Sequence, residues 1–272
     1  MQPARGRERF LIQPAMISED LSWGVFPANF EKVSDHNGNR MLVRQDCSRE
    51  IDFSLCRNEP DRSAESPYHG RGALNAIQLS DGATALVRQY HHGGLLRGLT
   101  GPWFFTWPPR PFRELSITEE LRRRGVRTVE VYAACVSRGV GPFYRGWLVT
   151  KELSGAADFW AALQSDFIER AGLEASLQAV AVSVRAMHRE GIYHSDLNLK
   201  NILVRMEGDG VVSYIIDFDK AKLVLGKLPT ELATKNLDRL LRSIRKLEPE
   251  RRHFSSSAWQ QFLNFYYGAA DA

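Results

Sequence analysis

A dense group of polar residues follows a helical stretch in the C-terminal half of the chain. His194, Asp196 and Asn201 stand in the pattern HxDLxxxN, directly before an apolar run that starts at Ile202. Sixteen residues after Asn201, a second apolar run leads into the triplet Asp217-Phe218-Asp219. A carboxylate can accept the proton of a hydroxyl, and carboxylate and amide oxygens are the ligands that hard cations prefer. Residues of these types can together accept a hydroxyl proton and bind a hard cation.

The order of these groups resembles the catalytic loop and the metal-binding motif of the protein-kinase-like superfamily. In that plan Asp196 orients the acceptor hydroxyl and accepts its proton, whereas Asn201 and Asp217 bind Mg²⁺ beside ATP. His194 is expected to brace the loop. Lys200 either leans toward the transferred phosphate or is an exposed loop lysine. The ordered set is far more specific than an isolated His-x-Asp, which is typical of ordinary surface loops.

Upstream elements fit the same plan. Gly70 and Gly72 form a GxG that precedes two predicted strands, 73–79 and 84–90, joined by the turn sequence SDG. A kinase Gly-rich loop would lie there, although the third glycine of GxGxxG is missing and a simple turn explains the pair equally well. Arg88, in the second strand, stands where kinases carry a phosphate-binding lysine, and its guanidinium fork can also hold phosphates.

A helix is predicted over residues 111–124, because proline stands near its start, arginines fill its last turn and a glycine follows. Glu114 lies in its first turns and could pair with Arg88, as the helix glutamate and the strand lysine do in kinases. Glu119 and Glu120 are interpreted as solvated residues of the exposed face.

The remaining pattern divides the chain. Strands are predicted over 126–136 and 146–152, and long amphipathic helices over 156–164 and 173–189, with a boundary near 154–155. The predicted class is an α+β, protein-kinase-like two-lobed fold, with an antiparallel sheet and one helix in the first lobe and a short helical second lobe. The predicted parts are an N-terminal extension or sheet edge, the N-lobe and the C-lobe, at residues 1–65, 66–153 and 154–272.

Only 53 residues follow Asp219 and no APE motif is present, which leaves little chain for the activation segment and helical lobe of a protein kinase. A small or lipid-linked acceptor fits better. The alternatives are another sugar or small-molecule phosphotransferase, heptose-directed or aminoglycoside-like, and a nucleotide-binding scaffold without activity. The presence of Asp196, Asn201 and Asp217 together argues against the scaffold.

The chain resembles the lipopolysaccharide kinases of Gram-negative bacteria, and within them the kinases of 3-deoxy-D-manno-octulosonic acid (Kdo). The resemblance covers about residues 66–247 and is carried by GRG at Gly70, LVRQYHHGGLL, REL, LRRRGV, DLN, IDFDKA and NLDRLLRS. It implies use of ATP and Mg²⁺ and transfer of the γ-phosphate to the 4-hydroxyl of Kdo on a lipid A precursor, Kdo-lipid IVA. It also implies a place in lipopolysaccharide core biosynthesis at the cytoplasmic face of the inner membrane.

Composition is compatible with an anionic partner. The chain has 28 Arg, 8 Lys and a formal net charge of +4, and arginine suits phosphate and carboxylate groups; a GC-rich genome explains the bias equally well. Nucleic acid is not expected, since no binding motif supports it. The aromatic stretch Trp103–Trp107, with Arg97, either rests at the anionic membrane surface or packs under a loop.

Three cysteines without a CxxC pair predict neither a disulfide partner nor a zinc site, and fit a reducing cytoplasm. The N-terminus is basic but has no continuous apolar stretch of signal-peptide length, and no run approaches a membrane span. Membrane contact is therefore expected to be peripheral.

Overall fold

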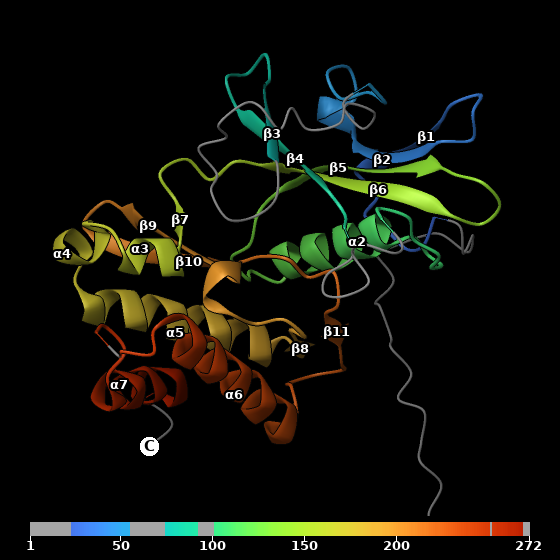
Figure 1. The fold of residues 1–272 in the computed structure, drawn as a ribbon. Helices are drawn as coiled ribbons and strands as arrows, with labels where there is room; N and C mark the ends of the chain where they lie inside the picture. Colours follow the sequence, from blue (N-terminus) through green and yellow to red (C-terminus); the bar gives the residue numbers. More distant parts are fainter. Residues whose placement is uncertain (1–22, 55–73, 92–100, 251, 269–272) are drawn as a thin grey trace, which may run out of the picture. The chain divides into compact units, whose positions relative to one another are not determined.

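The computed structural model describes residues 23–54, 74–91, 101–250 and 252–268. The chain folds into two compact units, each with its own topology (Figure 1). The sheet unit draws on described residues from 23–120 and 129–153, and the helical unit on those from 121–128 and 154–268. The architecture is α+β, as predicted.

The sheet unit is built on six antiparallel strands in the order β1-β2-β5-β6-β4-β3. They are β1 Phe30–Ser34, β2 Arg40–Arg44, β3 Leu74–Gln78, β4 Thr84–Gln89, β5 Val131–Arg138 and β6 Tyr144–Lys151. The pair β1 and β2, which precedes the region of the family resemblance, forms one edge of this sheet.

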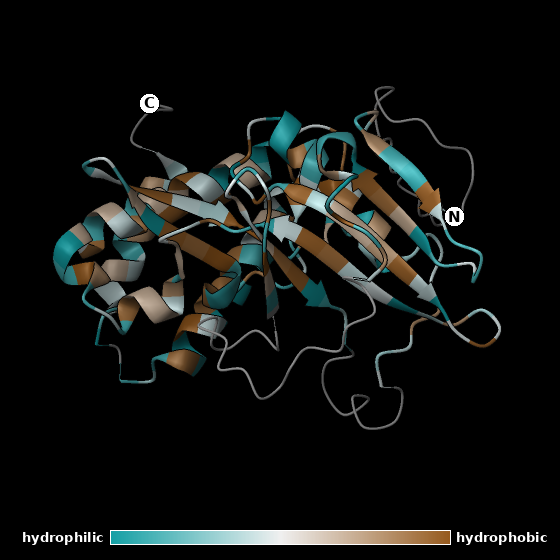
Figure 2. Ribbon diagram, turned by 90° about the horizontal axis from the view of Figure 1, so that it is seen from above, coloured by the Kyte–Doolittle hydropathy of each residue, from teal (hydrophilic) through white to brown (hydrophobic). Residues whose placement is uncertain are grey.

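Apolar residues alternate between the two faces of the sheet, as the period of two requires; the apolar stretches are brown in Figure 2. Leu42, Ala134 and Leu148 belong to the core cluster that includes Phe112 and Leu115 of helix α2 (Arg110–Arg123). The residues between them on the same strands enter a second cluster: Met41, Val43, Ala133, Cys135, Trp147 and Val149. Both faces of the central strands are therefore buried.

Helix α2 agrees with the predicted helix and ends at the predicted glycine. Gly125 has φ 80° and its N–H donates to the Arg122 carbonyl oxygen over 2.9 Å, the left-handed turn that favours glycine. Glu119 and Glu120 are buried, so their interpretation as solvated residues was wrong. The reason is visible at Glu119, whose Oε1 accepts the backbone N–H of Val131 at 2.9 Å and thereby holds the start of β5.

The helical unit is organised around α5 (Leu173–Arg189), whose buried face repeats at helical spacing through Leu177, Val180, Ala181 and Val184. α5 packs against α7 and β10. The other helices are α3 Phe159–Leu163, α4 Phe167–Ala171, α6 Thr230–Leu247 and α7 Ser256–Tyr267. The strands are β7 Ala157–Asp158, β8 Ile192–Tyr193, β9 Ile202–Glu207, β10 Gly210–Ile215 and β11 Lys222–Leu223, in the orders β10-β9-β7 and β11-β8.

Two predicted elements were wrong in extent. The predicted helix 156–164 is the short strand β7 followed by five helical residues, because Asp158 caps α3 by accepting the Ala161 N–H at 3.0 Å. The strand predicted from residue 126 begins only at Val131, since residues 121–128 belong to the helical unit. Within the described residues, no helix is long and apolar enough to cross a membrane.

Candidate active site

The catalytic loop runs from β8 to a single 3₁₀ turn, Leu199–Asn201, in front of β9. Two side-chain amides hold its tip: Nδ2 of Asn201 and Nδ2 of Asn198 donate to the backbone oxygen of Asp196, at 2.9 and 2.8 Å. The side-chain oxygen of Asn198 in turn accepts the Lys200 N–H at 2.9 Å. Asp196 itself is exposed. The main chain of the proposed base is therefore fixed while its carboxylate faces solvent.

His194 is buried and joins the loop to the strand that leads to Asp217. Its Nδ1 accepts the Asp196 N–H at 3.1 Å, so Nε2 carries the proton and donates to the Ile216 carbonyl oxygen at 3.0 Å. Burial lowers the pKa of His194, which keeps this ring neutral. The contacts are those of a bracing residue.

Asp217 has an unusual backbone. With φ 68°, it is the one non-glycine residue with positive φ in the described part of the chain. Aspartate tolerates this conformation better than most residues, and such a conformation persists only where the surrounding structure holds it. The Ile216 N–H donates to the Asn201 carbonyl oxygen at 3.0 Å, and Phe218 is buried with its ring 5.1 Å from that of His194. The backbones before Asp217 and at Asn201 are thus adjacent.

The donor set suits Mg²⁺. Asn201 uses Nδ2 in the loop, so Oδ1 is the atom that it can offer to a cation, and Asp217 has a partly buried carboxylate. No group of three or more His, Cys, Asp or Glu positioned to hold a metal occurs in the described ranges. Mg²⁺ usually takes one or two carboxylates and completes its shell with water and substrate phosphates, whereas a structural zinc site needs four protein ligands. The residues present therefore fit Mg²⁺.

Asn236 of α6 anchors the loop from below and is fully buried. Its Oδ1 accepts the His194 N–H at 3.0 Å, and its Nδ2 donates to the His194 carbonyl oxygen at 2.7 Å. The same Oδ1 accepts Nε2–H of His188 at 3.1 Å, which leaves Nδ1 of His188 to accept the Tyr266 hydroxyl at 2.7 Å. Burial lowers the pKa of His188 to about 4, so it is neutral. We call Asn236, His188 and Tyr266 the anchor network.

Sequence reasoning missed the anchor network. Asn236 was noted only as part of the segment NLDRLLRS. The signal that could have found it is a polar side chain on the apolar stripe of α6, in line with Leu237, Leu240 and Ile244.

In the sheet unit, Arg88 and Glu114 form the predicted ion pair. Nη2 of Arg88 lies 2.7 Å from each carboxylate oxygen of Glu114. The Tyr90 hydroxyl also donates to Glu114, and the guanidinium of Arg88 lies over the Tyr90 ring, 4.8 Å from its centroid. Glu114 is only 2% exposed, against 27% for the Arg88 side chain. A buried carboxylate thus holds a partly accessible cation on β4.

Other predicted residues stand as follows. Lys200 is half-buried in the same 3₁₀ turn as Asn201. Gly70, Gly72 and Arg97 lie outside the described residues. Cys47 and Cys135 are buried, and burial raises the pKa of the Cys47 thiol to about 11.

A braced HxDLxxxN loop, a DFD motif after the following hairpin, and a strand arginine paired with a helix glutamate are typical of a protein-kinase-like phosphotransferase. A family model, described as "Lipopolysaccharide kinase (Kdo/WaaP) family", matches residues 57–266. The chain belongs to this family.

Several relatives of the chain are named as kinases of 3-deoxy-D-manno-octulosonic acid. A 3-deoxy-D-manno-octulosonic acid kinase of Vibrio vulnificus is 35% identical over 202 residues, which cover 72% of this chain and 80% of that protein. The enzyme of the same name from Xylella fastidiosa is 32% identical over 187 residues, 67% of this chain and 70% of its own length. A solved structure of WaaP in complex with acyl carrier protein aligns with 19% identity and a TM-score of 0.47, over 87% of this chain and 78% of the other.

Proposed function

We propose that this protein transfers the γ-phosphate of ATP to the 4-hydroxyl of Kdo on a lipid A precursor, Kdo-lipid IVA, in lipopolysaccharide core biosynthesis. The observation that carries the proposal is the catalytic loop, in which the Asp196 carboxylate is exposed above a fixed main chain beside Asn201 and Asp217. Family membership supports a lipopolysaccharide acceptor, and the names of the relatives support Kdo.

In the proposed reaction Asp196 orients the acceptor hydroxyl and accepts its proton. The hydroxyl oxygen forms a bond to the γ-phosphorus, the bond to the β,γ-bridging oxygen breaks, and ADP leaves. Asn201 and Asp217 would hold Mg²⁺, which when bound neutralises charge on the phosphate oxygens. Asp196 acts mainly in the transition state, so ATP binding should depend on it little.

The cationic and glycine residues are proposed to bind the nucleotide. Arg88, fixed by Glu114, would contact the phosphates, and Gly70 and Gly72 would let the backbone approach them closely. Lys200 would face the transferred phosphate. In this proposal the sheet unit serves as the N-lobe, residues 66–153 with the edge strands β1 and β2, and residues 154–272 form the C-lobe.

Because the acceptor is a lipid, we propose that the protein is cytoplasmic and associates peripherally with the anionic cytoplasmic face of the inner membrane. The aromatic stretch Trp103–Trp107 supports this, since Phe105 and Trp107 are exposed at its centre and end.

The proposal is tested by transfer of labelled γ-phosphate from Mg·ATP to Kdo-lipid IVA. Asp196→Asn should lower the turnover number by about 10²–10⁴-fold and leave ATP affinity within about twofold. Asp209→Asn, at the exposed turn between β9 and β10, is the matched control and should behave as the parent. Turnover of Asp196→Asn at the parent rate would refute the site. Hydrolysis of ATP without a labelled Kdo product would refute the acceptor.

A further inference from the structure

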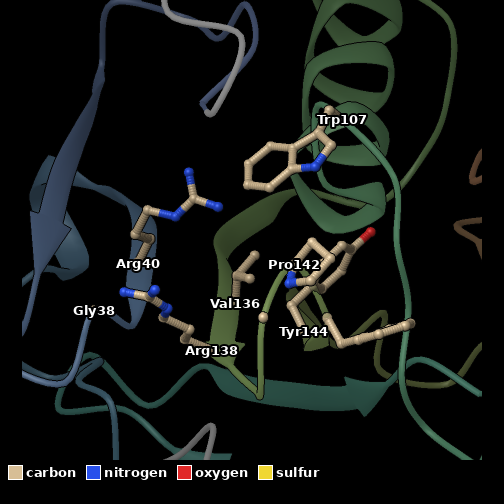
Figure 3. Close-up of a pocket in the computed structure, with 9 residues that line it drawn as sticks. Gly38, Arg40, Trp107, Val136, Arg138, Pro142 and Tyr144 are labelled. Carbon is tan, nitrogen blue, oxygen red and sulfur yellow. The ribbon is translucent and has the colours of Figure 1, made fainter.

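A cavity of about 310 Å³ opens at one end of the sheet unit, apart from the residues proposed for catalysis. It lies where the β1–β2 turn, the β5–β6 turn and the loop before α2 meet. Figure 3 shows Arg40 and Arg138 on one side, with the ring of Trp107 and the segment Pro142–Tyr144 on the other. Among the residues that the structure describes, no carboxylate lines the cavity. Its polar wall is therefore cationic.

Arg40 is held over aromatic rings. Its guanidinium carbon lies 5.2 Å from the centroid of Trp107 and 5.5 Å from that of Trp23. Guanidinium groups stack on aromatic faces, and the N–H donors at their edges suit planar and tetrahedral anions.

Arg138 ends β5 and is exposed. Its backbone N–H donates to Oδ1 of Asn39 at 2.9 Å, and its side chain passes close to Gly38, where a Cβ would stand 3.2 Å from Cδ of Arg138. Within the described residues, no carboxylate oxygen lies within salt-bridge distance of the Arg138 guanidinium. The acid of the same turn, Asp35, accepts three hydrogen bonds from Asn37 and Asn39. Two cations thus face one cavity.

The opposite wall is preformed. The Tyr144 hydroxyl bonds to the Thr106 hydroxyl and accepts the Arg110 N–H at 3.0 Å. Phe104 and Tyr144 exchange backbone hydrogen bonds of 2.8 and 3.0 Å. These bonds tie the Trp107 loop to β6, so little ordering is required when a ligand binds.

An apolar rim lies beside the cavity. Of the nine large hydrophobic side chains that are exposed among the described residues, five lie in two segments beside it: Trp103, Phe105, Trp107, Val140 and Phe143. Val140 is 90% and Phe105 60% exposed, and the rings of Phe105 and Phe143 lie 6.1 Å apart. Trp103 is the least exposed of the five and lies under Arg145, 4.5 Å from ring centroid to guanidinium. A cationic cavity beside an apolar rim suits the membrane interface, where anionic head groups meet acyl chains.

We propose that this cavity binds the phosphate of an anionic membrane lipid, with Arg40 and Arg138 on the phosphate oxygens and the apolar rim in the bilayer interface. The inference rests on the peripheral association proposed above and is independent of the phosphoryl-transfer step, since neither arginine belongs to the catalytic loop or to the Arg88–Glu114 pair.

The test is co-sedimentation of the full-length protein with vesicles of phosphatidylcholine alone or with added phosphatidylglycerol. Arg138→Gln should weaken binding to the anionic vesicles about fivefold, and the double variant with Arg40→Gln about 25-fold, as expected for basic residues at an anionic surface. Arg170→Gln removes the same charge from exposed helix α4 and should have no effect. Equal losses in Arg138→Gln and Arg170→Gln would overturn the site in favour of a general charge effect.

Two further arms identify the ligand. Vesicles with the anionic lipid should shift the tryptophan emission of the parent, and this shift should shrink in Trp107→Phe. Inorganic phosphate at the same phosphorus concentration should produce no such shift; a shift with phosphate and none with vesicles would overturn the lipid assignment. Turnover on a detergent-soluble Kdo acceptor should be unchanged in Arg138→Gln. Loss of that turnover with retained vesicle binding would count against the cavity as a separate site.

Discussion

The catalytic loop and the Arg88 side chain are supported in opposite ways. Beneath the loop, the anchor network is buried and uncharged, with two neutral histidines joined by the side chain of Asn236. Beside Arg88, the support is the buried carboxylate of Glu114, which pairs with the guanidinium and accepts a hydrogen bond from the Tyr90 hydroxyl. A neutral network fixes a backbone position and is vulnerable to acid. A charged pair fixes a cation and is vulnerable to the loss of either member.

The largest effect is expected from Asn236→Leu. This change leaves three buried groups without their hydrogen-bond partner: the N–H and carbonyl of His194 and the Nε2–H of His188. Each unpaired group lowers the stability of the fold by about 1–3 kcal/mol. The free energy of unfolding should fall by about 4 kcal/mol, with the turnover number lowered in the protein that remains folded. Urea denaturation measures the first and the labelled-phosphate assay the second.

Asn264→Leu is the control, because Asn264 is exposed on α7 and bonds only to Gln260 among the described side chains. A loss below about 1 kcal/mol for Asn236→Leu would mean that the loop is held mainly by its own amides.

Acid should break the neutral network next. His188 has a pKa of about 4 when folded, against 6.5 ordinarily. Between these values the unfolded chain binds a proton that the folded chain does not, so stability is complete above about pH 6.5 and falls as the pH drops toward 4. The loss from His188 should reach about 3 kcal/mol. The downward pKa shift of His194 acts in the same direction.

The measurement is the free energy of unfolding at several pH values for the parent and for His188→Gln. The difference between the two proteins isolates the histidine from the carboxylates. Parallel profiles would show that His188 does not titrate in this window.

Glu114→Gln tests the charged pair of Arg88 and Glu114. It preserves the shape and an acceptor for Tyr90 but removes the charge beside Arg88, at about 2 kcal/mol of stability, a value below that for fully buried pairs because Arg88 is partly exposed. The KM for ATP should rise more than the turnover number falls, since Arg88 is proposed to bind phosphates. Glu169→Gln, in the first turn of α4, serves as the control. An unchanged KM for ATP would separate the pair from nucleotide binding.

Tyr266→Phe should have the smallest effect. It removes the donor to Nδ1 of His188 and leaves Asn236 in place, for about 1 kcal/mol of stability and little change in activity. Thermal unfolding beside a steady-state assay would measure both. An activity loss as large as that of Asn236→Leu would show that Tyr266 supports the catalytic loop as strongly as Asn236 does.

The features that sequence could predict are the local ones. The HxDLxxxN loop, helix α5 and the β3–β4 hairpin each depend on residues that are close together in the chain. The Arg88–Glu114 pair was predicted from the strand and helix arrangement of kinases. The hydrogen bonds of the anchor network and its contact with His194 join residues that are 42 to 78 positions apart, and no local pattern encodes such pairings. The prediction that Glu119 and Glu120 are solvated was wrong for a related reason. A helical carboxylate is ordinarily solvated, and the backbone partner of Glu119, at Val131, lies on another element.

The hydrogen bonds of the catalytic loop also set its dynamics. The amide protons of His194 and Asp196 are bonded to Asn236 and to the His194 ring, although neither residue lies in a helix or a strand. Hydrogen–deuterium exchange at these two amides should therefore be slow, with opening governed by release of α6 and not by local fluctuation of the loop. Their exchange rates would report, without substrate, what fraction of the molecules has the base aligned.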